Sequence, residues 1–198
     1  MIYFFFITLA IIVSFFVQEF IPFFAWAFYS RLLLVHTVYY CAAVSVPFPV
    51  MLFLALLTGF IWDARYFVPV QVIQEVGVGQ GGQLELPFGF TIFIFGLLGS
   101  LIQGVRPLFR RGRWELPVFL IGFCVSLGLL LEYMVISFQR GGLEVPPEFW
   151  WKILMTGLFT TLISPFLLLW FSRLADRVGY KIQMSGITRK YTYDGNAF

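Results

Sequence analysis

Apolar runs of about 20 residues recur along this chain, and they limit its fold more than any other feature. A bilayer core is about 30 Å thick, so a helix that rises about 1.5 Å per residue needs about 20 residues to cross it. The chain of 198 residues is 60% hydrophobic and only 12% charged, whereas a soluble domain is about 25% charged. We therefore predict an all-α integral membrane protein.

Breaks between the runs divide the chain into a bundle of transmembrane helices over residues 1–172. Six spans are predicted, at approximately 2–20, 31–46, 48–62, 88–105, 116–138 and 150–172. The segment 64–87 is expected to be an extracytoplasmic loop, and 173–198 a basic cytoplasmic tail. No Lys or Arg precedes the first run and no cleavage signal follows it, so we interpret it as a retained span.

Basic residues are distributed unevenly between the two sides of this bundle. With an even number of spans, both termini lie on one side, which carries nine of the thirteen Lys and Arg residues. The positive-inside rule makes that side cytoplasmic. Because these residues flank spans, the expected partner is the lipid bilayer and no nucleic acid. The predicted cytoplasmic basic surface consists of Arg106, Arg110, Arg111, Arg113, Arg173, Arg177, Lys181, Arg189 and Lys190.

Residues that could carry catalysis or bind a metal are sparse. His36 is the only histidine, so no His-based metal cage can form, and we expect it to make an interhelical hydrogen bond in preference to shuttling protons. Cys41 and Cys124 lie within apolar runs, where small buried hydrophobic side chains are expected. No G-x-S-x-G or H-E-x-x-H motif is present. We expect no cofactor and no enzymatic activity, with an intramembrane enzyme as a minor alternative.

Small residues recur at helical spacing in two of the predicted spans. Gly96, Ser100 and Gly104 are four residues apart in the fourth span, as are Gly122 and Ser126 in the fifth. Such ridges let helix backbones approach closely in a membrane. They indicate either internal packing of the bundle or docking of a partner's transmembrane helix.

Charged residues stand within or at the ends of the spans. Glu132 lies about 16 residues into a helix that enters from the cytoplasm, and Asp63 follows Trp62 at the outer end of the third span. A charge at such a depth costs roughly 2–3 kcal/mol unless it is paired or hydrated. Two interpretations stay open: ion pairs of these carboxylates with Arg31 or Arg65, or a ligand or partner site. Trp62 is expected at the level of the lipid headgroups.

Three stretches resemble the MreD family, the membrane subunit of the bacterial rod shape-determining system: VMLFLALLTGFIWDARYF, LPFGFTIFIFGLLGSLIQGVRPLFRRGRWELP and LFTTLISPFLLLWFSRLADRVGY. In that family the third span closes with a Gly-x-x-x-Asp-like signature, here Gly59 to Asp63. The next span opens with a glycine after a polar turn, here Gly89, and the last bears a mid-helix proline, here Pro165. The resemblance covers nearly the full chain, although the segment 64–86 and the C-terminal tail are longer than the family pattern.

The resemblance implies a non-enzymatic scaffold in the bacterial cytoplasmic (inner) membrane. Such a scaffold binds MreC, a bitopic membrane protein. Through MreC it connects MreB filaments with the RodA glycosyltransferase and its penicillin-binding transpeptidase, and so supports peptidoglycan synthesis and rod cell shape.

The MreD fold is also similar to the substrate-binding subunits of energy-coupling-factor vitamin transporters. That similarity supplies the alternative function, in which Trp62, Asp63 and Glu132 would line a vitamin cavity. Those subunits commonly carry an A-x-x-x-A element in the first helix, where this chain has Ala10 and Ser14. The departure disfavours the alternative without excluding it.

Overall fold

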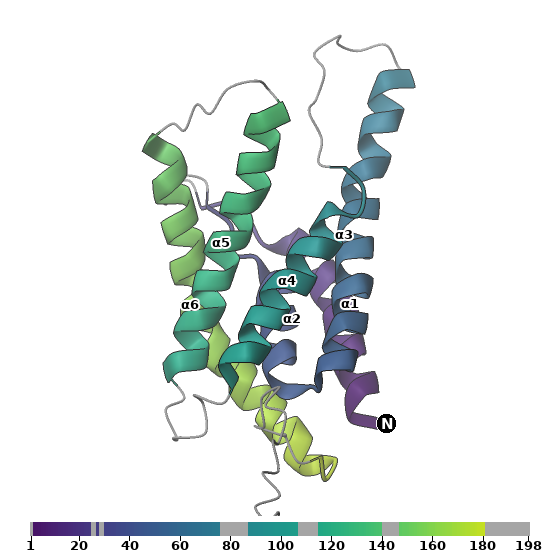
Figure 1. Cartoon of the computed structure of the whole chain (residues 1–198), viewed down its shortest axis with the longest axis vertical. Coiled ribbons are helices and arrows are strands. Elements are labelled where there is room, and N and C mark those ends of the chain that lie inside the picture. Colours follow the sequence, from purple (N-terminus) through teal and green to yellow (C-terminus); the bar gives the residue numbers. More distant parts are fainter. Residues whose placement is uncertain are drawn as a thin grey trace, which may run out of the picture.

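The computed structural model describes residues 2–24, 27, 30–75, 87–106, 115–139 and 147–180, with 66–75 described by their backbone alone. The helices, shown in Figure 1, are α1 (Ile2–Phe20), α2 (Leu34–Ser45), α3 (Phe48–Glu75), α4 (Phe90–Val105), α5 (Glu115–Gln139) and α6 (Pro147–Arg177). Apart from one isolated bridge, these residues contain no strand. The all-helical prediction is confirmed, and each predicted span overlaps one helix.

The helices differ in whether they can cross a bilayer. α1, α3, α5 and α6 are long and apolar enough to do so, which is the mark of a membrane protein. α2 and α4 have 12 and 16 residues, equivalent to about 18 and 24 Å, less than the bilayer core of about 30 Å. The two short helices therefore end within the bundle, where their terminal N–H and C=O groups need partners from the protein.

α2 occupies the centre of the bundle. It contacts every other helix, and its side chains from Val35 to Ser45 are all buried. The Tyr39 hydroxyl donates a hydrogen bond to the backbone carbonyl of Phe95 in α4, at 2.9 Å. Cys41 and Cys124 are buried free thiols, as predicted.

The start of α1 and the end of α6 meet at one end of the bundle, called the terminal end here; the opposite end is the far end. Tyr3 stacks on Tyr180 with ring centroids 4.4 Å apart. Within α6, Pro165 has no N–H to donate to the carbonyl of Thr161. The Ser164 hydroxyl donates to that carbonyl instead, at 3.1 Å. The last part of α6 passes beneath the other helices toward the start of α1 (Figure 1).

Two helices extend past their predicted limits. α3 continues to Glu75, into the segment 64–87 that the sequence predicts as a loop, and α6 runs to Arg177 in place of ending at 172. Hydropathy falls after residues 62 and 172 because charged residues follow. The helices continue beyond these positions because a helix needs apolar residues only where it contacts lipid. The segments 76–86 and 181–198 lie outside the described residues.

Candidate functional site

The carboxylate of Asp63, near the far end of α3, binds the first residues of α4. The backbone N–H of Gly89 donates to Asp63 Oδ2 at 2.7 Å, and the Thr91 hydroxyl donates to Oδ1. Gly89 is the N-cap residue of α4; it has a φ of +94° and supplies no capping side chain. Asp63 therefore acts as the N-cap of α4 from a neighbouring helix, where a negative charge also suits the helix dipole.

One turn before Asp63, Gly59 allows α3 and α4 to approach each other closely. A Cβ atom at Gly59 would lie 2.5 Å from the Cα atom of Ile92, which is closer than packed atoms tolerate. The Thr91 hydroxyl lies 3.2 Å from the carbonyl oxygen of Gly59. Gly59, Asp63, Gly89 and Thr91 thus form one contact region, called the α3–α4 joint below.

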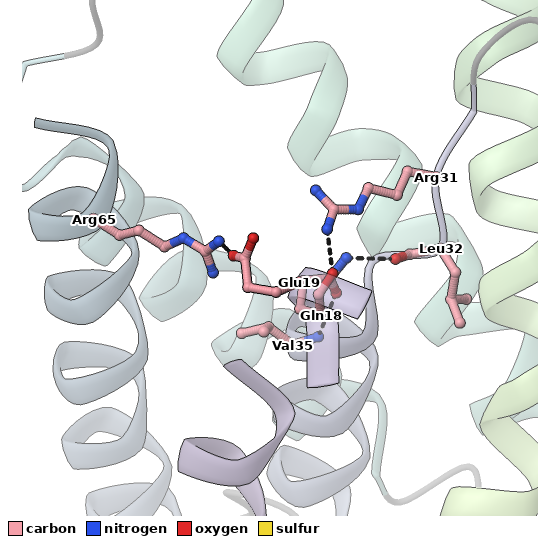
Figure 2. Close-up of polar contacts among 6 residues, drawn as sticks. All are labelled: Gln18, Glu19, Arg31, Leu32, Val35 and Arg65. Atoms are coloured by element: carbon pink, nitrogen blue, oxygen red, sulfur yellow. Dashed lines mark hydrogen bonds and ion pairs between the residues drawn. The ribbon is translucent and has the colours of Figure 1, made fainter. Parts of the chain in front are cut away.

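Gln18 of α1 caps the N-terminus of α2 in the same way. Its Oε1 atom accepts hydrogen bonds from the N–H groups of Leu34, at 2.5 Å, and Val35, at 3.3 Å. Its Nε2 atom donates to the carbonyl of Leu32 at 2.8 Å (Figure 2). The sequence does not mark Gln18 as a functional residue. The available signal was an amide within an apolar run, one residue before Glu19.

Arg31 and Arg65 do not pair with the carboxylates considered from the sequence. Figure 2 shows Arg65 paired with Glu19, and Arg31 directed at a backbone carbonyl near the end of α1. Within the described ranges, neither arginine forms an ion pair with Asp63 or Glu132. That interpretation is therefore wrong for these residues, because closer partners engage both guanidinium groups.

Two side chains from the end of α4 cap the C-terminus of α2. Gln103 Nε2 donates to the carbonyls of Ala43, at 2.6 Å, and Val46, at 2.8 Å. Arg106 Nε donates to the carbonyl of Val44 at 2.7 Å. A cation at a helix C-terminus is stabilised by the helix dipole, so both ends of the central helix are held by side chains of other helices.

Arg106 is therefore no part of a basic surface, and that prediction is wrong. Its side chain is 2% exposed because it reaches back to α2. Burial lowers the pKa of its guanidinium from the usual value, whereas the hydroxyls of Tyr180 and Tyr3 raise it. Arg173 and Arg177 are exposed on α6. The other members of the predicted surface lie outside the described residues: Arg110, Arg111, Arg113, Lys181, Arg189 and Lys190.

Trp62 packs into the bundle and does not point outward as an interfacial anchor. It is 9% exposed, and its ring meets that of His36 edge-on at 4.6 Å and that of Phe15 at 6.2 Å. His36 is also buried, and its Nδ1 atom has no hydrogen-bond partner in the described structure. The interhelical hydrogen bond expected of His36 is thus not formed at this atom.

Gly96 and Gly104 lie on the open side of α4. A Cβ atom at either position would meet no atom within 4 Å, and the Ser100 hydroxyl donates to the Gly96 carbonyl of its own helix at 2.7 Å. This small-residue ridge is not used in a helix–helix contact between the parts of the chain that the structure describes.

The ridge in α5, by contrast, packs against α6. A Cβ atom at Gly122 would overlap the Thr161 hydroxyl, and one at Gly157 would overlap the Ser126 hydroxyl. The two helices approach so closely because each presents a glycine to the other. Of the two ridges, only the one in α5 serves internal packing here.

Glu132, on α5, stands apart from these capping contacts. Among the described residues its carboxylate has no hydrogen bond and no ion pair, although it is near enough to Asp63 and Tyr40 to interact with them electrostatically.

No protein-family model matches the chain, and no curated protein or solved structure is significantly similar to it.

Proposed function

We propose that this chain is a non-enzymatic scaffold of the bacterial cell-elongation complex. In this proposal it lies in the cytoplasmic membrane as a six-span protein and binds an MreC-like bitopic protein. It thereby helps to organise peptidoglycan synthesis and rod cell shape, with MreB, RodA and a penicillin-binding transpeptidase as indirect partners. The basis is the resemblance to the MreD family.

The observation that carries the proposal is the α3–α4 joint. The residues that make the resemblance most specific, Gly59, Asp63 and Gly89, come from two separate stretches of sequence and meet at this one joint. There they fix α4 against α3, because Asp63 accepts a hydrogen bond from the Gly89 N–H group and the two helix backbones are in contact at Gly59. Residues that define the architecture in this way are what members of a scaffold family would share.

The other polar side chains of the bundle support the same conclusion. Gln18, Gln103 and Arg106 all bind backbone groups of α2. Caps at both ends hold the central helix in one position, and a fixed frame is what a binding surface requires. Around this frame, α1, α4 and α5 expose large apolar side chains such as Phe16, Phe93 and Phe123, which suit lipid or a partner's transmembrane helix.

The orientation of the scaffold is part of the proposal. Arg173 and Arg177 are exposed near the terminal end, and the basic residues of 107–113 and 181–190 flank the helices that finish there. By the positive-inside rule this end faces the cytoplasm. The far end, with Asp63 and Gln18, then faces the periplasm, where the bulk of a bitopic partner lies.

Depletion in the rod-shaped bacterium that encodes the chain tests the proposal. We expect depleted cells to become round and to lose their normal pattern of wall synthesis, and expression of the wild-type chain to restore both. If depleted cells keep their rod shape and their pattern of wall synthesis, the proposal fails.

A vitamin-binding transporter subunit is the second candidate. It is favoured by two buried polar atoms that lack partners in the described structure, His36 Nδ1 and the Tyr40 hydroxyl, and by the unpaired carboxylate of Glu132. Such groups could orient a small ligand. Native mass spectrometry of the freshly purified protein separates the candidates, because a vitamin bound in stoichiometric amount would support the transporter subunit and contradict the scaffold.

A further inference from the structure

Glu132 places a carboxylate within the membrane part of α5. The helix has 25 residues, so it is about 37 Å long, and Glu132 lies about 7 Å beyond its midpoint toward the far end. The half-thickness of the bilayer core is about 15 Å. The carboxylate is therefore at hydrocarbon depth, where a charge needs a partner or water.

The described residues provide no cation for Glu132. Arg65 pairs with Glu19, and Arg31 binds a carbonyl of α1 and lies 5.0 Å from the centre of the Phe23 ring. Two segments near this end lie outside the described residues: 76–86 contains no Lys or Arg, and 140–146 contains Arg140. The nearby charge of Asp63 has the same sign as that of Glu132, and its oxygens already accept hydrogen bonds.

The hydroxyl of Tyr40 also lacks a partner beside Glu132. Tyr40 is fully buried, and its hydroxyl makes no hydrogen bond in the described structure. It lies 3.8 Å from the position that a Cβ atom of Gly128 would take. Gly128 precedes Glu132 by one turn on the same face of α5, and Tyr40 and Glu132 interact electrostatically. These two unpartnered groups form the Tyr40–Glu132 niche.

α4 begins beside the niche and does not extend past it. Ile94 of α4 lies beside Gly128 of α5, and the two helices are antiparallel. One turn further toward the far end, Glu132 is therefore level with Phe90, the first residue of α4. Figure 1 shows α3 and α5 continuing past that point, and Glu132 itself is partly exposed.

We infer that the Tyr40–Glu132 niche binds a Lys or Arg side chain of a partner's transmembrane helix. The inference rests on the proposed function, which supplies a partner with a single span. The partner's cation neutralises Glu132 through a charge-assisted hydrogen bond, and a Lys or Arg N–H donates to the Tyr40 oxygen. A helix is favoured over a free cation because Glu132 is partly exposed at hydrocarbon depth, where a cation carried on a partner's helix is available and a free cation is poorly solvated.

Co-expression of the chain with MreC from the same genome tests this inference. Glu132→Gln keeps the size of the side chain and removes its charge, so we expect at least about tenfold less MreC to be recovered with the purified chain. Tyr40→Phe should cause a smaller loss. Glu148→Gln is the matched control, because Glu148 is an exposed carboxylate near the same end, and it should recover as much MreC as the wild type.

A charge exchange identifies the partner's residue. In the Glu132→Lys background, each Lys or Arg in the periplasmic half of the MreC span is changed to Glu in turn, and one such change should restore the complex. Recovery of MreC by Glu132→Gln at the wild-type level would overturn the inference and leave the proposed function intact. Absence of MreC from the wild-type preparation would overturn both. A small organic cation that co-purifies with the wild type but not with Glu132→Gln would overturn the inference, because the niche would then bind a free ligand and not a partner's helix.

Discussion

Asp63 and Gly89 are joined by a hydrogen bond of 2.7 Å although 26 positions separate them in the chain. The carboxylate of α3 thereby fixes the starting point of α4. The charge looks expensive at the edge of an apolar run, but the carboxylate is buried and accepts hydrogen bonds from Gly89 and Thr91. It supplies the capping acceptor that Gly89, which has no side chain, lacks.

Replacement of Asp63 tests the α3–α4 joint. Asp63→Ala leaves the Gly89 N–H and the Thr91 hydroxyl without their acceptor, so we expect the free energy of unfolding in detergent to fall by about 1–3 kcal/mol. Insertion should stay near the wild-type level, because a charge at a helix end contributes little to insertion, whereas recovery of MreC should fall. A variant that inserts poorly, but binds MreC normally once inserted, would contradict this role.

Two glycine substitutions compare a closed position with an open one. Gly59→Ala places a Cβ atom against the backbone at Ile92 and should lower the free energy of unfolding by about 1–3 kcal/mol. Gly96→Ala meets no atom and should be neutral or raise that free energy by up to about 1 kcal/mol. Thermal unfolding of both variants in the same detergent provides the measurement. Equal effects would mean that the close approach of α3 and α4 is absent in solution.

Gln18 and its neighbour Glu19 form a second matched pair. Gln18→Ala removes the acceptor of the Leu34 and Val35 N–H groups, so hydrogen exchange at the start of α2 should accelerate and stability should fall by about 1–3 kcal/mol. Glu19→Gln breaks only the partly exposed pair with Arg65 and should cost at most about 1 kcal/mol. Unchanged exchange in Gln18→Ala would show that the cap is dispensable.

Glu132 should destabilise the chain when no partner is bound. Glu132→Gln removes a charge that has no cation among the described residues, so we expect the free energy of unfolding of the isolated chain to rise by roughly 1 kcal/mol at pH 8. The same variant should lose MreC, which would separate binding from stability. A marked loss of stability would instead indicate an internal partner for Glu132.

Hydropathy predicts which segments are helical but not where the helices finish. α1 and α5 agree with the predicted limits within a residue or two, because their apolar runs end where their helices end. α3 and α6 continue beyond theirs, since polar residues after the span sustain a helix equally well. The limits of a span and of its helix coincide only where a turn follows immediately.

The candidate site was harder to predict, since its contacts depend on how the helices are aligned. The sequence marks Asp63 as unusual, but only the alignment of α3 with α4 shows that its partner is a backbone N–H group. In the sequence Arg106 is one of several loop cations, but in the fold its side chain lies against the end of α2. Gln18 could not be predicted because an uncharged side chain in a long apolar run barely changes the hydropathy.

Affinity purification of the chain from native membranes, with identification of the co-purifying proteins, tests the scaffold most directly. The account predicts an MreC-like bitopic protein in near-equimolar amount, with more of it bound to the wild type than to Asp63→Ala. Recovery of the chain without such a partner, and with a vitamin bound in stoichiometric amount, would contradict the account.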